Sequence, residues 1–105
     1  MKLESFRTYG LAREVFEECQ RLKLKHYLKD QLERASLSVV LNLVEGAAKP
    51  TPKEKNRFYS IAYGSNRETQ VLLDLVKAPL PLRQKADHTG ACLFRLLHPL
   101  PPRSP

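Results

Sequence analysis

The stretch RASLSVVLNLVEG, residues 34 to 46, has the spacing of a helix but carries polar residues through an otherwise apolar segment. Four of these, Arg34, Ser38, Asn42 and Glu45, follow one another at intervals of four, four and three residues. At about 3.6 residues per turn they form a single polar stripe. The remaining positions are mostly Leu and Val, so the stripe belongs to a helix that is apolar around most of its circumference. It must face a neighbouring helix, another subunit or a ligand.

The apolar periodicity on either side of this stretch predicts three more helices. We expect helices over about residues 5–24, 28–47, 52–77 and 83–98. Phe6 is expected among the core residues of the first helix. The third is expected to pack through one stripe, formed by Phe58, Ile61, Ala62, Ser65, Glu68, Leu72 and Leu75.

Start and stop signals support these boundaries. Thr51 offers an N-cap hydroxyl, Pro52 occupies the first helical position, and Glu54 stands at the capping-box position of the third helix. Gly46 near the end of the second helix and Pro50 just beyond it are read as its stop signals. The prolines at 79 and 81 are read as the end of the third.

Short connections between helices imply antiparallel neighbours. The sequence therefore predicts an all-α fold, an antiparallel up-down four-helix bundle with a short fourth helix. Residues 1–98 are expected to form the bundle domain. Residues 99–105, PLPPRSP, are expected to form a flexible, proline-rich C-terminal tail.

A turn near residues 49–51 would place Arg34 beside Ser65 and Glu68. We expect Arg34 and Glu68 to form a partly buried, charge-assisted pair, whose disruption by removal of one partner would cost about 3–5 kcal/mol. A structural role is favoured over a ligand site, since buried ion pairs often serve packing. The expected polar network comprises Gln31, Arg34, Ser38, Asn42, Glu45, Ser65 and Glu68.

Two stretches, LKDQLERASLSVVLNLVEG (28–46) and RFYSIAYGSNRE (57–68), resemble the four-helix-bundle proteins encoded in intervening sequences of bacterial 23S ribosomal RNA genes. The good match covers about residues 28–76. Tyr63 and the proline-rich segment from Pro79 depart from the family pattern. The resemblance implies a homo-oligomer, with a pentameric ring as the expected form, and related bundles bind nucleic acid. It implies no enzymatic activity.

Length and composition agree with one soluble domain. The chain has 105 residues, a net charge of +7 and a pI near 9.7, a balance that favours an anionic partner. No apolar run is long enough to cross a membrane and the N-terminus lacks a signal core, so a cytoplasmic location is expected. The two cysteines, Cys19 and Cys92, and the three histidines are too scattered to predict a metal site.

Catalytic motifs are absent from the sequence. It contains no glycine-rich phosphate loop, GxSxG or HExxH segment. Glu45 and Glu68 could form an acid–base pair, yet Asn42 and Arg34 are expected to satisfy rather than activate them. We expect no catalytic residue, no metal and no cofactor.

Basic residues near the two ends of the bundle are the candidates for nucleic-acid binding. Lys53 and Lys55 stand in the first turns of a helix, where the dipole disfavours cations and free N–H groups favour anions. Backbone phosphates would relieve that mismatch, in RNA or DNA. The alternative is a scaffold that recruits a protein partner without nucleic acid. The full candidate set is Lys49, Lys53, Lys55, Arg57, Lys25 and Lys29.

Overall fold

The computed structural model describes residues 2–101 and contains four α-helices. They are α1 (Leu3–Arg21), α2 (His26–Ala48), α3 (Pro52–Leu75) and α4 (Leu80–Leu97). No strand occurs between residues 2 and 101, so the predicted all-α fold with four helices is confirmed. Most of the predicted tail, residues 102–105, lies outside the described residues.

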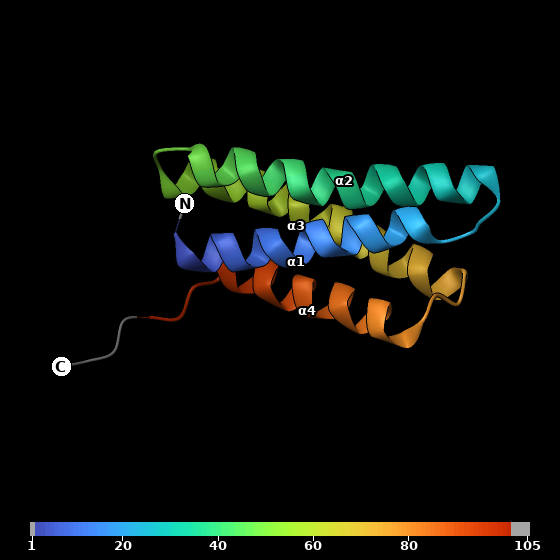
Figure 1. The fold of residues 1–105 in the computed structure, drawn as a ribbon. Helices are drawn as coiled ribbons and strands as arrows, with labels where there is room; N and C mark the ends of the chain where they lie inside the picture. The colour runs from blue at the N-terminus through green and yellow to red at the C-terminus, as the bar shows by residue number, and fades with distance from the viewer. Residues whose placement is uncertain (1, 102–105) are drawn as a thin grey trace.

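The four helices lie side by side around a shared core (Figure 1). Each packs against the next along the chain, and α1 also packs against α4, which closes the ring of contacts. Figure 1 shows the chain running from one end to the other and back at each short connection. The resulting body measures 52 × 24 × 17 Å. None of the helices described is both long and apolar enough to cross a bilayer.

Two stop signals, Pro79 and Pro81, act differently from the expectation. Gly46 lies inside α2, two residues before its end, as expected, and is buried. Pro79 is the N-cap of α4 and Pro81 stands in its first turn, so α4 begins at Leu80 rather than near residue 83. Proline is tolerated there because the first turn has no intrahelical partner for its missing N–H. At 18 residues, α4 is only one residue shorter than α1.

The caps of α3 explain its clear boundaries. The Thr51 hydroxyl accepts a hydrogen bond from the Glu54 backbone N–H at 3.2 Å and donates to the Glu54 carboxylate at 2.9 Å. At the other end Ala78 N–H donates to Leu73 O at 3.0 Å and Lys77 N–H donates to Asp74 O at 3.1 Å. This is the Schellman pattern, with Lys77 at the left-handed position (φ 52°) usually taken by glycine.

The core consists of two hydrophobic clusters along the bundle. The cluster toward the α1–α2 turn is formed by Val15, Cys19, Leu32, Leu73, Ala78, Leu82 and Ala86. The cluster toward the α2–α3 turn is formed by Ala12, Val39, Leu43, Tyr59, Ala62 and Leu93. Phe6, expected in the core, is 62% exposed.

Helix α3 is rotated relative to the expected packing face. Its buried residues are Tyr59, Ala62, Asn66, Thr69 and Leu73. Of the predicted stripe, only Ala62 is among them, while Ile61 and Leu75 are exposed. The prediction chose the most apolar stripe, whereas the structure buries a stripe that contains an asparagine and a threonine.

These inward polar groups are satisfied by local hydrogen bonds. Asn66 Nδ2 donates to the Ala86 carbonyl of α4 at 3.0 Å. The Thr69 hydroxyl donates to the Ser65 carbonyl one turn earlier at 2.9 Å, and Thr89 donates likewise to Lys85 at 2.8 Å. Burial of a polar side chain costs little once it has such a partner.

Gly46 and Tyr59 determine how closely α2 and α3 approach. A Cβ added at Gly46 would lie 2.7 Å from Tyr59 Cε1 and 3.2 Å from the backbone oxygen of Lys55. The Tyr59 hydroxyl in turn lies 3.2 Å from the buried Ser5 hydroxyl of α1, within hydrogen-bond distance. One ring thus links three helices, and only glycine leaves room for it.

Gly46→Ala should therefore destabilise the bundle. Overpacking against a fixed ring costs about 1–3 kcal/mol, which outweighs the gain of about 0.5–1 kcal/mol from replacing a helical glycine. Gly10→Ala is the matched control, because nothing lies within 4 Å of its added Cβ, and it should raise stability. Denaturant midpoints of the two variants test this. A Gly46→Ala protein as stable as the parent would contradict it.

Candidate nucleic-acid interface and the α2–α3 face

The polar stripe of α2 lies along its seam with α3. The Ser38 and Ser65 hydroxyls are 2.7 Å apart, and Asn42 Nδ2 donates to the Ser38 carbonyl at 2.9 Å and to its hydroxyl at 3.2 Å. These three side chains are partly buried. The centre of the predicted network therefore does join the two helices.

The charged members of the stripe are on the surface. Arg34 Nη2 lies 3.9 Å from Glu68 Oε2, but their side chains are 66% and 60% exposed. The expected burial of this pair was wrong, because both side chains are long enough to reach water from the edge of the seam. An exposed pair contributes about 0–1 kcal/mol. Arg34 also donates to Gln31 Oε1, and Glu45 pairs with Lys49 at 3.7 Å.

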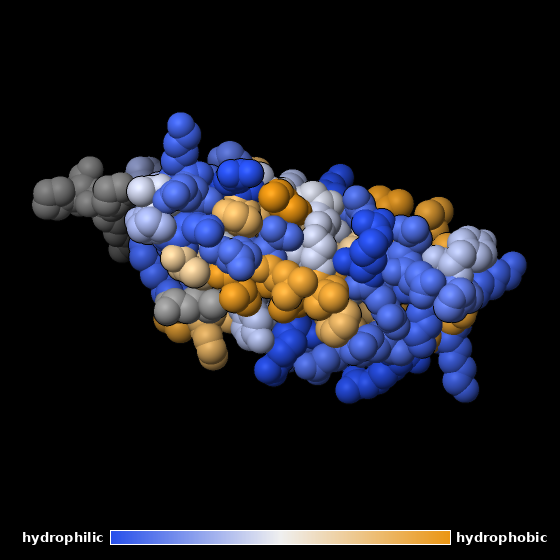
Figure 2. All heavy atoms as spheres, turned by 90° about the horizontal axis from the view of Figure 1, so that it is seen from above, coloured by the Kyte–Doolittle hydropathy of each residue, from blue (hydrophilic) through white to orange (hydrophobic). Residues whose placement is uncertain are grey.

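Beside this seam, α2 and α3 turn apolar side chains to solvent. We call these residues the α2–α3 band: Leu37, Leu41, Val44, Ile61, Val71 and Leu75. Figure 2, seen from above, shows apolar side chains running along the middle of this face with hydrophilic residues on either side. An open hollow of about 410 Å³ lies next to the band, lined in part by Gln31, Glu68 and Val71. Single apolar residues are ordinary on a surface, whereas a group of them on one face often marks an interaction site.

The six basic candidates do not form one site. Lys25 and Lys29 are at the α1–α2 turn, whereas Lys49 to Arg57 surround the α2–α3 turn at the other end of α2. Lys29 and Lys49 are about 30 Å apart at 1.5 Å per residue. We call the end with the α2–α3 turn the basic end.

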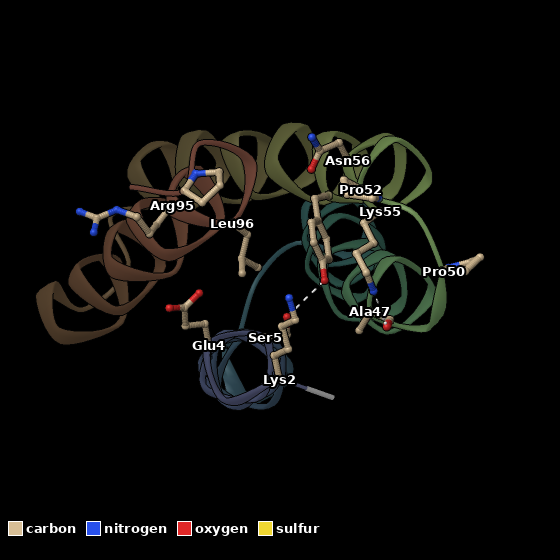
Figure 3. Close-up of a pocket in the computed structure, with 12 residues that line it drawn as sticks. Lys2, Glu4, Ser5, Ala47, Pro50, Pro52, Lys55, Asn56, Arg95 and Leu96 are labelled. Atoms are coloured by element: carbon tan, nitrogen blue, oxygen red, sulfur yellow. Dashed lines mark hydrogen bonds between the residues drawn. The ribbon is translucent and has the colours of Figure 1, made fainter. Parts of the chain in front are cut away.

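Lys55 has a structural partner. Its ammonium donates to the Ala47 carbonyl at 3.0 Å, in the last turn of α2 (Figure 3). There the helix dipole is negative and favours a cation. The prediction that the Lys55 cation is unfavourably placed at the positive end of the α3 dipole was therefore wrong, because its side chain reaches from the start of α3 to the end of α2. Lys53 remains exposed at the start of α3.

Two more cations at the basic end pack around Phe58. Lys49 Nζ lies 5.0 Å and the Arg57 guanidinium carbon 5.9 Å from the ring centroid. Tyr59 is only 5% exposed, while Phe58 is half-buried. Phe58 is thus shielded by cations, and it is the Tyr59 ring that enters the core.

The basic end also receives residues that the sequence reading missed. Lys2, the N-cap of α1, and Arg95, in the last turn of α4, line a hollow of about 480 Å³ together with Glu4 and Lys55. Figure 3 shows these four side chains arriving from three helices, with Arg95 extending away toward solvent. The up-down topology expected from the short connections could have found them, since it brings the start of α1 and the end of α4 to the α2–α3 turn.

The thiols and the paired lysine have shifted pKa values with structural causes. Burial raises the pKa of the Cys19 thiol to about 12, and burial also raises the pKa of Cys92. Both thiols are therefore protonated and weakly nucleophilic near neutral pH. The hydrogen bond from Lys85 to Glu18, at 2.6 Å, raises the pKa of the Lys85 ammonium. This ion pair ties α4 to α1.

Comparison with known proteins identifies the family. The model of the family described as 23S rRNA-intervening sequence protein matches residues 6–86. The match covers most of the chain, and the chain belongs to this family. A search of curated proteins and a search of solved structures returned no match.

The role of Lys55 can be separated from that of its neighbour. Lys55→Met keeps helix propensity but removes the donor to Ala47, so it should lower the free energy of unfolding by about 1 kcal/mol. Lys53→Met is the control, and it should leave stability unchanged or slightly higher because a cation leaves the positive end of α3. Thermal and denaturant melts of both variants provide the measurement. Equal effects of the two substitutions would argue against a stabilising hydrogen bond from Lys55 to the Ala47 carbonyl.

Proposed function

We propose that this member of the 23S rRNA-intervening sequence protein family is a non-enzymatic homo-oligomer that binds RNA or DNA through backbone phosphates at its basic end. Its building block is an antiparallel up-down bundle with a proline-rich tail, at work in the cytoplasm. Five subunits are the expected number, as the resemblance of the sequence to the family implies.

One observation carries the nucleic-acid part of the proposal. Lys2 and Lys53 stand at the N-termini of α1 and α3, and both N-termini lie at the basic end. Helix dipoles and free N–H groups make such ends favourable for anions and unfavourable for cations. A phosphate between the two ends and their lysines would offset this repulsion. The overall charge of +7 adds long-range attraction to a polyanion.

The α2–α3 band supports the oligomer. A second subunit packed on it would remove six apolar side chains from water. The neighbouring seam would then be partly desolvated. Because the Arg34–Glu68 pair would be less exposed to water, the attraction between its charges would be stronger than in a single chain.

The same band favours the second candidate, a scaffold that recruits another protein. An interface of that kind is mixed in polarity, so its affinity should respond weakly to salt. Phosphate binding depends steeply on salt because counterions are released. Salt dependence therefore distinguishes the two functions.

Charge reversal at the two helix starts tests phosphate binding. In the Lys2→Glu, Lys53→Glu double variant, affinity for duplex DNA and for RNA should fall and the slope against salt should flatten. The fold should become more stable, by about 0.3–1 kcal/mol per residue, because acids suit N-terminal turns. Filter binding at two salt concentrations beside a thermal melt measures both effects. Unchanged binding would move the site to Lys25 and Lys29. If the parent protein binds no nucleic acid even at low salt, the scaffold that recruits another protein is the remaining candidate function.

The oligomer is tested by a charge in the centre of the band. Leu41→Glu should dissociate the assembly to a 12.0 kDa species in sedimentation at micromolar concentration. Glutamate is a good helix former, so the bundle itself should persist. Leu80→Glu is the control, because Leu80 is exposed to the same 55% on α4, outside the band. A parent protein that sediments as a monomer would refute the oligomer.

A further inference from the structure

A groove between α3 and α4 gathers aromatic side chains beside arginines. The Tyr63 and Phe94 rings lie 6.4 Å apart and tilted by 53°, and the Phe94 and His98 rings lie 4.4 Å apart. Phe94 is 51% exposed, so its ring is not committed to the core. Arg67 and Arg95, both exposed, also line this groove, whose volume is about 480 Å³.

The wall of the groove holds hydrogen-bond acceptors. Gln70 Nε2 donates to Asp87 Oδ1 at 2.8 Å. Gln70 Oε1 is buried and has no hydrogen-bond partner among residues 2–101. Buried polar atoms are nearly always paired, so this oxygen has an unused capacity to accept a hydrogen bond. Gly90, whose added Cβ would lie 3.0 Å from Asn66 Nδ2 and 3.7 Å from the Gln70 amide, keeps the groove open.

We propose that this α3–α4 groove is a subsite for one unpaired base of a nucleic-acid strand. The proposal rests on the proposed nucleic-acid binding and names its substrate class as single-stranded rather than duplex. A planar base can stack on the Phe94 ring while its N–H groups donate to Gln70 and its flanking phosphates meet the arginines. Guanine suits the wall best, since its adjacent N1–H and N2–H₂ donors match the Gln70 and Asp87 acceptors. Uracil offers only one donor, at N3.

Position in the bundle supports this assignment. Arg95 lines both this groove and the hollow at the basic end, so a strand bound there continues directly into the groove. Phe94, Arg95 and His98 lie beyond residues 6–86, which the family model matches. The opposite wall of the groove, with Arg67 and Gln70 on α3, lies within the matched residues.

The test compares single strands with duplex. The probes are a fluorescent oligouridine, the same strand containing guanines, and duplex DNA, each measured by anisotropy. Phe94→Ala should weaken binding of the guanine strand about tenfold, the loss of one stacked base. Duplex affinity and the salt slope should not change. Phe94→Tyr should restore single-strand affinity because it restores the ring.

Phe6→Ala is the control for loss of an exposed ring, because Phe6 lies on α1 outside the groove and is 62% exposed. If the guanine strand binds Phe94→Ala as tightly as the parent, while the Lys2 and Lys53 variants still lose affinity, the subsite is refuted and the proposed function stands. Equal losses for Phe6→Ala and Phe94→Ala would also refute it. No binding of any probe by the parent would overturn both proposals.

Discussion

The contact of the Tyr59 ring with Gly46 is the constraint on which the rest of the bundle depends. It brings α2 and α3 close together, and the Tyr59 hydroxyl extends the link to Ser5 on α1. With Tyr59 turned inward, helical periodicity turns Asn66 and Thr69 inward as well. In this position the Asn66 amide donates a hydrogen bond to the Ala86 carbonyl and links α3 to α4.

The same rotation has a consequence on the outside. Residues on the far side of α3, including Ile61, Val71 and Leu75, are left in water, as is Leu41 of α2. The bundle therefore buries polar side chains that form hydrogen bonds within the chain, and it leaves apolar side chains exposed to water. Exposed apolar side chains do not stabilise a single chain, whereas an assembly that covers the α2–α3 band would be stabilised by removing them from water.

The sequence predicts the four helices well because apolar spacing and caps are local signals. The capping box at Thr51 and the seam between Ser38 and Ser65 were both readable from it. The rotation of α3 was not, because Ile61 and Leu75 look like core residues until the room beside Gly46 is known. Nor could spacing show that the Arg34 guanidinium reaches water, since that depends on the length of its side chain and the edge position of its helix. Local pattern thus specifies elements, while close packing specifies which face of each is buried.

The basic end shows how structure separates stabilising cations from those open to a ligand. It collects two helix N-termini and two C-termini, and a cation is favourable only at the latter. Lys55 lies against the end of α2, where its ammonium donates to the Ala47 carbonyl, so the fold itself accounts for this cation. Lys2 and Lys53 stand at N-termini, where the fold would prefer acids. These two charges cost stability where they stand and face solvent at one shared end, so the proposed anion would offset a repulsion that the folded chain leaves in place.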